Sequence, residues 1–548
     1  GQNMAGYIRF SFRAERTGKM ILRFGEMLDE NGELTQKNIQ CSSKKKTTPL
    51  QRIIYRCRKG FNVYKTRFAV FGFRYCEVSA DDLSDLEDAE FTAVAVYSDL
   101  RRTGFFKSSN TLLDQFVEST VWSARSHFLD IPTDCPTRER HGWTGDSQIF
   151  FATAGWLVDC AAFFRKYVQD MYDWQRKDGC LPQIVPEGGV DFYMDAMNGS
   201  VGWADAGILI PYRFWKRYGD RSILEEYYKG MKKYARFMMK RCGKHTLLSK
   251  PLRIPHGYRK YAVNAGQSYG EWAEPADVHP NKWTDMVLPH PEVSTAYTSF
   301  VMGHMAEIAA ELGEEADADL YREYARQVRR SYQAIRSLPE FTLDTDRQAM
   351  LVRPLYMGLL DTEGRKYAQE RLVKALDHYG WRLGTGFLST PLILGVLSEI
   401  DIGYAYRLLE NEEMPGWLFM PKHGATTIWE SWEGTEAQNG IASLNHYSKG
   451  AVCAWLFETM CGIRIDGENH FLLSPKPGGS FTCAGASYDS IYGTVACRWE
   501  RSDAGVRYTA EIPPNTAARV ELPGMEPFEV KAGKYEWMAE TEKMTQKK

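Results

Sequence analysis

The chain is organised around one stretch, Asp134-Cys135-Pro136-Thr137-Arg138-Glu139-Arg140-His141-Gly142-Trp143-Thr144-Gly145-Asp146. Proline and glycine interrupt regular structure here, so the stretch predicts a loop. Apolar residues at helical spacing flank it, over residues 110–128 and 147–177. A polar and aromatic loop between two apolar helices is typical of a binding surface held by a rigid scaffold.

Three carboxylates and two arginines lie within these thirteen residues. Acids this close repel one another, so at least one pKa should rise unless Arg138 and Arg140 compensate. A carboxylic acid with a raised pKa can donate a proton near neutral pH. The alternative interpretation is a solvated charged turn with incidental arginine–aspartate pairs, because structural ion pairs also perturb pKa values.

The regions on either side of this loop differ in hydrophobic period. Residues 1 to about 100 alternate with period two, which predicts strands at 7–13, 19–24, 61–64, 68–78 and 91–96 in a β-sandwich-like module. The basic run at residues 44–46 is expected to be a solvated loop. After about residue 461 the pattern is again β, with strands at 486–488, 493–499, 506–512 and 518–522, and a disordered tail at 541–548.

Between about 108 and 456 the period is helical. Helices are expected at residues 110–128, 147–177, 204–218, 221–241, 294–313, 317–337, 364–378, 391–399, 401–410 and 447–460. Long loops separate them at 179–203, 250–292, 380–390 and 411–446, and loops this long are often functional. Many helices with long loops and no strand alternation fit a closed ring of helical hairpins.

A second stretch, Trp429-Glu430-Ser431-Trp432, places a carboxylate between two tryptophans. A carboxylate against apolar rings is poorly solvated, which suits a general base acting on water. The alternative is that both tryptophans are core residues and Glu430 is an exposed helix acid. His446 follows in Asn445-His446-Tyr447, where a single histidine is more often structural.

Aromatic–acid pairs recur in two other loops, Gly202-Trp203-Ala204-Asp205 and Tyr269-Gly270-Glu271-Trp272. In a ring of hairpins such loops surround one end, where side chains converge on a concave site. Trp203 and Trp272 are therefore expected to line a binding site rather than the core.

Composition restricts the function further. A net charge of −2 argues against nucleic-acid or membrane-surface partners, and the 15 Trp and 30 Tyr suit either a large core or stacking on sugar rings. The 11 Cys are scattered without a C-x-x-C pair, which favours free thiols in a reducing compartment, the cytoplasm. No signal-peptide or transmembrane pattern is seen, although the start Gly1-Gln2-Asn3 leaves room for a longer native N-terminus. No metal-ligand spacing or nucleotide loop occurs, so neither metal nor cofactor is expected.

These motifs resemble those of the glycoside hydrolase family 78 α-L-rhamnosidases, and the resemblance covers about residues 6–525. The stretch at 134–146 resembles the family motif D-C-P-x-R-E-R-x-G-W-x-G-D, and residues 202–205, 386–391, 425–430, 445–447 and 474–479 support it. The resemblance implies an (α/α)6-barrel catalytic domain between β-sandwich domains, divided as residues 1–104, 105–460 and 461–540. It also implies inverting hydrolysis of terminal α-L-rhamnosides, with a rhamnose-containing glycoside as the partner molecule.

By the same resemblance, Glu139 corresponds to the general acid and Glu430 to the general base. The residues that would contact the sugar are Asp134, Arg138, Trp143, Asp146, Trp203, Trp272 and His446. Competing interpretations are a phosphorylase or polysaccharide lyase on the same ring fold, and a non-catalytic sugar-binding protein. A phosphorylase needs a phosphate site near Glu430, a lyase needs a Tyr or His base and cationic residues, and a dead site would lack one glutamate. Fold by itself does not choose among them.

Overall fold

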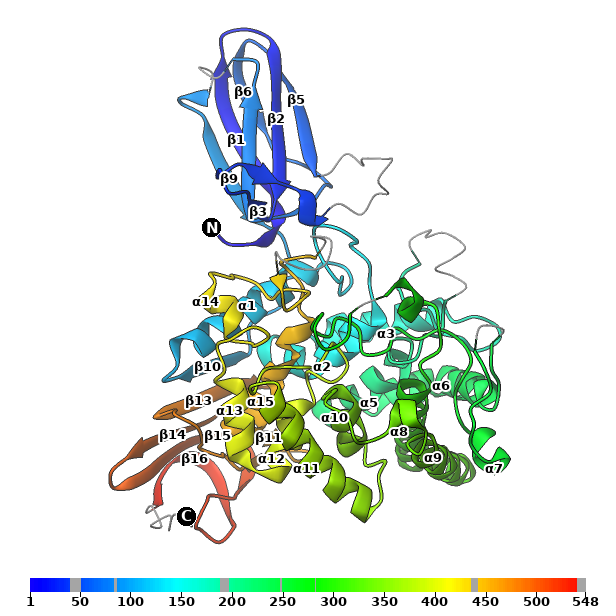
Figure 1. Ribbon diagram of the computed structural model, residues 1–548. Helices are drawn as coiled ribbons and strands as arrows, with labels where there is room; N and C mark the ends of the chain where they lie inside the picture. The colour runs from blue at the N-terminus through cyan, green and yellow to red at the C-terminus, as the bar shows by residue number, and fades with distance from the viewer. Residues whose placement is uncertain are drawn as a thin grey trace.

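The computed structural model describes residues 1–39, 51–82, 86–187, 197–246, 249–280, 282–434 and 442–539. The basic run at 44–46 and the tail at 541–548 lie outside them. Figure 1 shows the N-terminal strands standing on a ring of helices, with the C-terminal strands packed against the side of that ring. Within the described ranges, no helix is long and apolar enough to cross a membrane.

The N-terminal domain is built from two facing sheets. Its strands are β1 (Met4–Ala14), β2 (Gly18–Gly25), β3 (Met27–Leu28), β4 (Leu34–Thr35), β5 (Arg52–Cys57), β6 (Gly60–Tyr64), β7 (Phe71–Phe73), β8 (Tyr75–Ala80) and β9 (Glu90–Ala95). One sheet pairs β1 with β6, β7 and β9, and the other has the order β5-β2-β8. Alternate residues such as Phe10 and Phe12 on β1 and Leu22 and Phe24 on β2 meet in one core. The predicted N-terminal sandwich is therefore confirmed.

Two strand predictions in this domain were wrong in detail. The segment 68–78 was expected to be one strand, but the chain bends at Arg74, so that β7 pairs with β1 and β8 pairs with β2 in the other sheet. Strand β5 was missed, because it lies beside β2 at the edge of its sheet and buries only Cys57. A strand with so little buried surface carries almost no hydrophobic alternation.

The middle of the chain is helical, in pairs that pack as hairpins. Its helices are α1 (Thr111–His127), α2 (Thr144–Leu157), α3 (Ala161–Asp173), α5 (Ala206–Tyr218), α6 (Ser222–Arg241), α7 (His256–Arg259), α8 (Pro291–Glu311), α9 (Glu315–Ile335), α10 (Ala349–Tyr356), α11 (Thr362–His378), α12 (Ile393–Ile400), α13 (Ile402–Leu409), α14 (Phe419–Lys422) and α15 (Cys453–Trp455). Helix α8 packs on α9, α10 on α11, α12 on α13, and α5 on α6.

Burial separates an inner from an outer set of helices. Every residue of α2 except Ala152 is buried, and α8 is buried along most of its length. In contrast, α9 buries one face, including Tyr321, Val328 and Tyr332, and exposes the rest. A helix that is apolar all round belongs inside a domain, whereas an amphipathic helix covers it. The 3₁₀ segment η7 (Ser448–Val452) and α15 pack against α2, and η7 also contacts α1, so the end of the helical region meets its beginning and closes the ring.

Some helix boundaries differ from the sequence prediction. The segment 147–177 was expected to be continuous, but Val158 is extended and bridges to Arg102, which separates α2 from α3. The segment 447–460 is a 3₁₀ turn, a short α turn and a π turn (η8, Leu456–Met460) rather than one helix. Helix α10 was missed; it is short, at eight residues, and contains Pro354.

The C-terminal strands are β11 (Ile463–Ile465), β12 (His470–Leu473), β13 (Cys483–Ser490), β14 (Gly493–Ser502), β15 (Gly505–Val520) and β16 (Phe528–Ala539). Together with β10 (Gly104–Ser108) they form one sheet with the order β10-β13-β14-β15-β12-β11, with β16 also paired to β15. Strand β15 pairs with β14 through its first half and with β12 through its second, and an irregularity lies between Ile512 and Ala517. Strand β10 (Gly104–Ser108) precedes the helices yet belongs to this sheet, so the segment at the predicted 104/105 boundary ties the C-terminal domain to the ring.

Candidate active site

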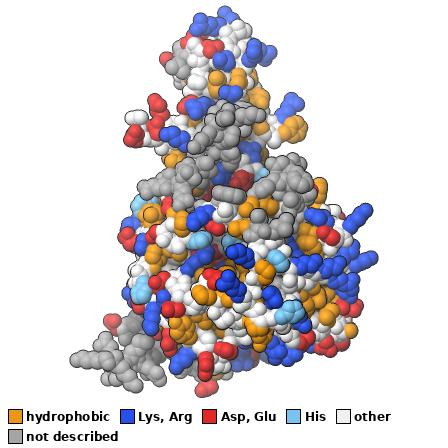
Figure 2. Space-filling model, turned by 45° about the vertical axis from the view of Figure 1, so that its right-hand side comes forward, with side chains coloured by type: hydrophobic (Ala, Val, Ile, Leu, Met, Phe, Trp, Pro, Cys, Tyr) orange, Lys and Arg blue, Asp and Glu red, His pale blue; other side chains and the backbone are white. Residues whose placement is uncertain are grey.

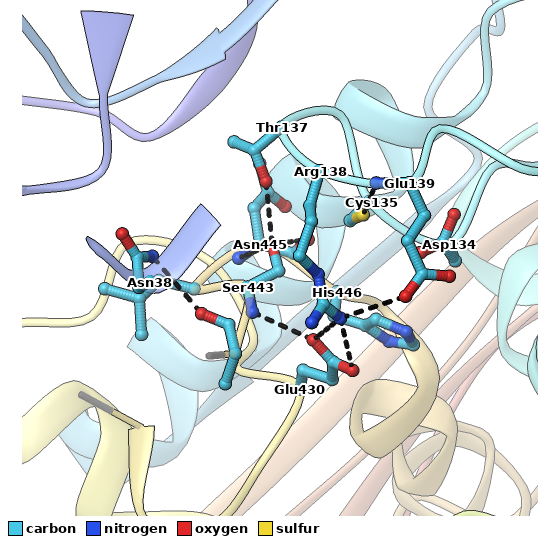
Figure 3. A network of polar contacts seen from close by, with 12 residues as sticks. Asn38, Asp134, Cys135, Thr137, Arg138, Glu139, Glu430, Ser443, Asn445 and His446 are labelled. Carbon is cyan, nitrogen blue, oxygen red and sulfur yellow. Dashed lines mark hydrogen bonds and ion pairs between the residues drawn. The ribbon is translucent and has the colours of Figure 1, made fainter. Parts of the chain in front are cut away.

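The loops that lead into inner helices bring the candidate residues together. Trp143 is the N-cap residue of α2, Asp205 is that of α5, and His446 lies two residues before η7, the segment that closes the ring. Because each inner helix is followed by an antiparallel outer one, the inner helices begin at the same end of the ring. Figure 3 shows the outcome: Arg138 and Glu139 from the first loop face Glu430 and His446 from the last.

Arg138 joins the two candidate catalytic carboxylates. One of its terminal nitrogens donates to both oxygens of Glu430, at 2.8 and 2.7 Å, and lies 3.3 Å from Oε1 of Glu139. The side chain of Arg138 is 9% exposed, that of Glu430 13% and that of Glu139 32%, so Glu139 is the more accessible of the two glutamates. Charge-assisted bonds of this kind fix orientation strongly. The structure thus brings together two glutamates from opposite ends of the helical region.

Each glutamate is also held by its own surroundings. Trp143 Nε1 donates to Oε2 of Glu139 at 2.9 Å, and the Glu139 backbone N–H donates to Cys135 Sγ at 3.1 Å. The backbone N–H of Ser443 donates to Oε2 of Glu430 at 2.8 Å. Several donors therefore set the positions of the oxygens of both carboxylates, and Arg138 is common to the two.

The expectation that an acid of the first loop has a raised pKa is confirmed for Asp134 and Asp146. The main cause is burial rather than the expected repulsion between the acids. Burial, and next the charge of Glu139, raises the pKa of Asp134 well above its ordinary value. Burial raises the pKa of Asp146 to about 7, although a hydrogen bond from Ser448 opposes the shift. Desolvation exceeds mutual repulsion in both cases. Arg140 turns toward the N-terminal domain, where it donates to Gln51 Oε1 at 2.9 Å.

His446 and Asp146 are both buried and lie beside each other. The Nε2 atom of His446 is 3.4 Å from Oδ1 of Asp146, which also accepts from the Ser448 hydroxyl at 2.7 Å. The Ser448 backbone N–H donates to His446 Nδ1 at 3.4 Å, which leaves the hydrogen of a neutral ring on Nε2. Burial, and next the charges of His127, Lys449 and Arg138, lowers the pKa of His446 well below its usual range.

The three candidate tryptophans differ in burial. Trp143 and Trp272 are half-buried, and their rings lie 5.5 and 5.9 Å from the ring of Tyr269. Trp203 is only 3% exposed and packs 4.7 Å from Tyr269. A Cβ atom on Gly145 would lie 2.4 Å from its indole, so the contact requires glycine. The expectation that Trp203 lies outside the core is wrong, because its loop folds beneath Tyr269 and Gly145.

The acids of the other two aromatic–acid pairs serve the scaffold. Asp205 is buried and accepts from the Gly202 backbone N–H at 2.7 Å and the Tyr234 hydroxyl at 2.8 Å. Glu271 accepts from the backbone N–H groups of Gly386 and Ser389, and forms an ion pair with Arg353. These acids hold the loops that carry Trp203 and Trp272.

Sequence reasoning missed Lys449, a fully buried lysine whose Nζ donates to the backbone carbonyl of Glu430 at 2.6 Å. The ammonium also lies 4.8 Å from the ring centre of Phe387 and 4.6 Å from that of Trp432. Burial lowers its pKa to about 7. The signal was available: Lys449 is the one cation in the small and apolar segment that follows Tyr447.

The cysteines and the surface charges agree with what the sequence composition predicts. All ten cysteines within the described ranges are free thiols, as the sequence predicted, and most of them are buried. Acidic, basic and apolar side chains are interspersed on the face shown in Figure 2, in keeping with the small net charge.

Comparison with known proteins gives a consistent picture along the whole chain. Residues 101–460 match the bacterial α-L-rhamnosidase six-hairpin glycosidase domain, residues 1–97 its concanavalin-like domain and residues 465–536 its C-terminal domain. An α-L-rhamnosidase of Streptomyces avermitilis is 30% identical over 97% of this chain and 48% of its own length. An α-L-rhamnosidase of Formosa agariphila is also 30% identical, over 95% of this chain and 54% of its own. The chain thus spans about half the length of these curated relatives.

A solved structure agrees with this match. The crystal structure of the Streptomyces avermitilis α-L-rhamnosidase, complexed with L-rhamnose, superposes with a TM-score of 0.82 at 28% identity, and the match covers 98% of this chain and 51% of that one. The six-hairpin helical domain between two sheet domains is therefore the fold of this chain. Together with the family models, these matches show that the chain belongs to the bacterial α-L-rhamnosidases.

Proposed function

We propose that this chain hydrolyses terminal α-L-rhamnosides, with Glu139 as the general acid and Glu430 as the general base. The observation that carries the proposal is the shared contact of both glutamates with one nitrogen of Arg138, although 292 positions separate Arg138 from Glu430. Glycoside hydrolysis needs such a pair of carboxyl groups on either side of the scissile bond. The family membership supplies the sugar, because relatives over the full chain carry the name α-L-rhamnosidase.

The proposed reaction uses the two carboxyl groups in opposite senses. Glu139 gives its proton to the glycosidic oxygen as the bond from that oxygen to the anomeric carbon breaks. Glu430 takes a proton from a water whose oxygen bonds to the anomeric carbon from the other face. The products are a free sugar of inverted configuration and the protonated leaving group. Proton transfer from Glu430 to Glu139 through solvent restores the starting state.

The sugar-binding roles are proposals of the same kind. Residues expected to hold hydroxyl groups or to form the pocket walls are Asp134, Arg138, Trp143, Asp146, Trp272 and His446, with the buried Trp203 supporting the wall from the core. Their support is that Arg138 contacts both glutamates and that Asp134 and His446 lie beside them (Figure 3), with Asp146 next to His446. Trp203 would contribute from beneath, since it is buried against Tyr269.

Substrate identity is tested with a panel of aryl glycosides: α-L-rhamnoside, α-L-fucoside, α-L-arabinofuranoside and β-D-glucuronide. The rhamnoside should be the substrate that turns over, and inorganic phosphate should neither accelerate the reaction nor appear in a sugar phosphate. Turnover of a non-rhamnoside only would reject the assignment of rhamnosides as substrates. Phosphate-dependent cleavage would indicate a phosphorylase, and binding without turnover would indicate a non-catalytic sugar-binding protein.

The catalytic pair is tested with Glu139→Gln and Glu430→Gln. Each should lower kcat on the aryl rhamnoside by roughly 100-fold or more, since general acid–base groups contribute about 10²–10⁴-fold. Glu412→Gln is a matched control, because Glu412 pairs with Lys422 at the surface and is 44% exposed. Full activity of either active-site variant would reject the assigned role.

Inversion is tested by the first-formed anomer. The contacts with Arg138, 3.3 and 2.7 Å long, keep the nearest oxygens of the two glutamates within the sum of these distances. Inverting pairs place their carboxyl groups about 6.5–9.5 Å apart, and retaining pairs about 5–5.5 Å. Because this bound on single oxygens fits both classes, proton NMR decides: early β-L-rhamnose supports inversion, whereas early α-L-rhamnose indicates retention.

A further inference from the structure

A buried carboxylate of the N-terminal sheets reaches the loop that carries the proposed base. Glu26 lies between β2 and β3 and is 1% exposed. Its Oε2 accepts from the backbone N–H of Leu444 at 3.1 Å and from Asn38 Nδ2 at 2.8 Å. Its Oε1 accepts from Asn3 Nδ2 at 3.1 Å. Burying a carboxylate costs free energy unless hydrogen bonds compensate for the lost water. The hydrogen bonds of Glu26 to the other domain therefore indicate a role for this contact.

Leu444 is adjacent to the residue that orients the base. The Ser443 backbone N–H donates to Oε2 of Glu430 at 2.8 Å, and the Glu430 backbone N–H donates to the Ser443 carbonyl at 3.0 Å. Asn38, which binds Glu26, also donates to the backbone carbonyl of Ala442 at 3.2 Å. Figure 3 shows Asn38, Ser443 and Glu430 in this order across the boundary between the domains. The backbone of residues 442–444 is thus fixed from the N-terminal side.

The same sheets touch the loop of the proposed acid. Gly72 in β7 packs so closely that a Cβ atom there would lie 2.6 Å from Thr137 Cγ2. Gln51 binds both backbone groups of Gly72 and accepts from Arg140. The Thr137 and Ser443 hydroxyls lie 3.3 Å apart, which joins the two loops on this side. The N-terminal domain therefore contacts both of the loops that carry the proposed catalytic pair.

We infer that Glu26 is a positioning residue for Glu430: its carboxylate holds the Ser443–Leu444 backbone, and that backbone holds the base against Arg138. The inference rests on the proposed function. A displacement of a catalytic group by about 1 Å can cost on the order of 100-fold in rate, so loss of this hold should lower turnover. Substrate contacts lie elsewhere, so KM should change little.

Two substitutions separate reach from charge. Glu26→Asp keeps the charge but withdraws the carboxylate by one methylene from the Leu444 N–H. Glu26→Gln loses the charge but keeps an oxygen at the right distance. Its new amide group can face Asn3, whose buried Oδ1 has no hydrogen-bond partner among the described residues. If positioning is the role, the aspartate variant fails and the glutamine variant functions.

The experiment measures kcat and KM on an aryl α-L-rhamnoside, together with hydrogen exchange of the peptide that contains Leu444. Glu26→Asp should lower kcat roughly 10-fold or more, with KM changed by less than about 3-fold and faster exchange at Leu444. Glu26→Gln should keep kcat within about 3-fold of wild type and retain protection. Glu77→Asp and Glu77→Gln are the controls, since Glu77 forms a surface pair with Arg23 in the same domain.

Three outcomes are distinguishable. Normal kcat in Glu26→Asp, in an active wild-type background, would overturn the positioning role and leave the proposed function standing. Equal loss in both Glu26 variants would show that the reach of the side chain does not by itself explain the role of Glu26, and would also overturn the inference. A wild-type protein inactive on every rhamnoside would reject the proposed function, and the inference with it.

Discussion

The two tryptophans Trp203 and Trp272 should respond differently to truncation. Trp203 is 3% exposed, has its ring 4.7 Å from that of Tyr269, and leaves no space for a Cβ atom on Gly145. Trp203→Ala therefore empties a core site, for which the cost is about 3–5 kcal/mol of unfolding free energy. Trp272 is half-buried, so Trp272→Ala should cost about 1–2 kcal/mol.

Backbone conformation sharpens the contrast. Trp272 has φ 44°, in the left-handed region that a side chain rarely adopts, and such strain costs about 1–3 kcal/mol. Trp272→Gly should relieve it and be at least as stable as Trp272→Ala. The strained backbone at Trp272 and its proposed place in the sugar site predict that both Trp272 variants raise KM for the aryl rhamnoside.

The assay combines chemical denaturation followed by circular dichroism with steady-state kinetics. Trp203→Phe should restore most of the stability, because an aromatic ring refills the site, whereas Trp174→Ala at a 42% exposed position should change neither stability nor KM. Equal, small stability losses for Trp203→Ala and Trp272→Ala would refute the argument from burial. An unchanged KM in both Trp272 variants would remove Trp272 from the pocket.

Three further predictions concern buried charges. Burial raises the pKa of Asp146 from 3.8 to about 7, so its contribution to stability is present below pH 3.8 and is lost as the pH rises through 7. Wild type should therefore lose stability relative to Asp146→Asn as the pH rises across this window. Parallel curves of unfolding free energy against pH for the two proteins would contradict the raised pKa. Burial lowers the pKa of Lys449 from 10.5 to about 7, so wild type should gain stability relative to Lys449→Met as the pH rises from about 7 to 10.5. A stability difference that does not change with pH would exclude the lowered pKa. Arg353→Met should cost about 3–5 kcal/mol, since it removes the ion-pair partner of the buried Glu271 and leaves the buried Glu292 with only the more distant Arg336. Arg365→Met at the surface should cost about 0–1 kcal/mol, and similar losses for the two variants in urea titrations would count against the buried network.

Much of this protein could be predicted from sequence alone. Hydrophobic period separates strands from helices, because burial of one face imposes period two on a strand and about 3.6 on a helix. The order of a sheet domain, a ring of hairpins and a second sheet domain therefore followed from local patterns. The motif at residues 134–146 and the pair Trp429-Glu430 are each a continuous run of residues. The two candidate catalytic glutamates and the family resemblance were therefore visible in the sequence.

Only the tertiary structure decided what those residues touch. The pairing of Arg138 with Glu430 spans 292 positions, and that of Glu26 with Leu444 spans 418, so no local pattern encodes either. Burial likewise depends on the elements folded above a residue: it places Trp203 in the core and raises the pKa of Asp146. Distance and desolvation are properties of the packed molecule, whereas period and motif are properties of the chain.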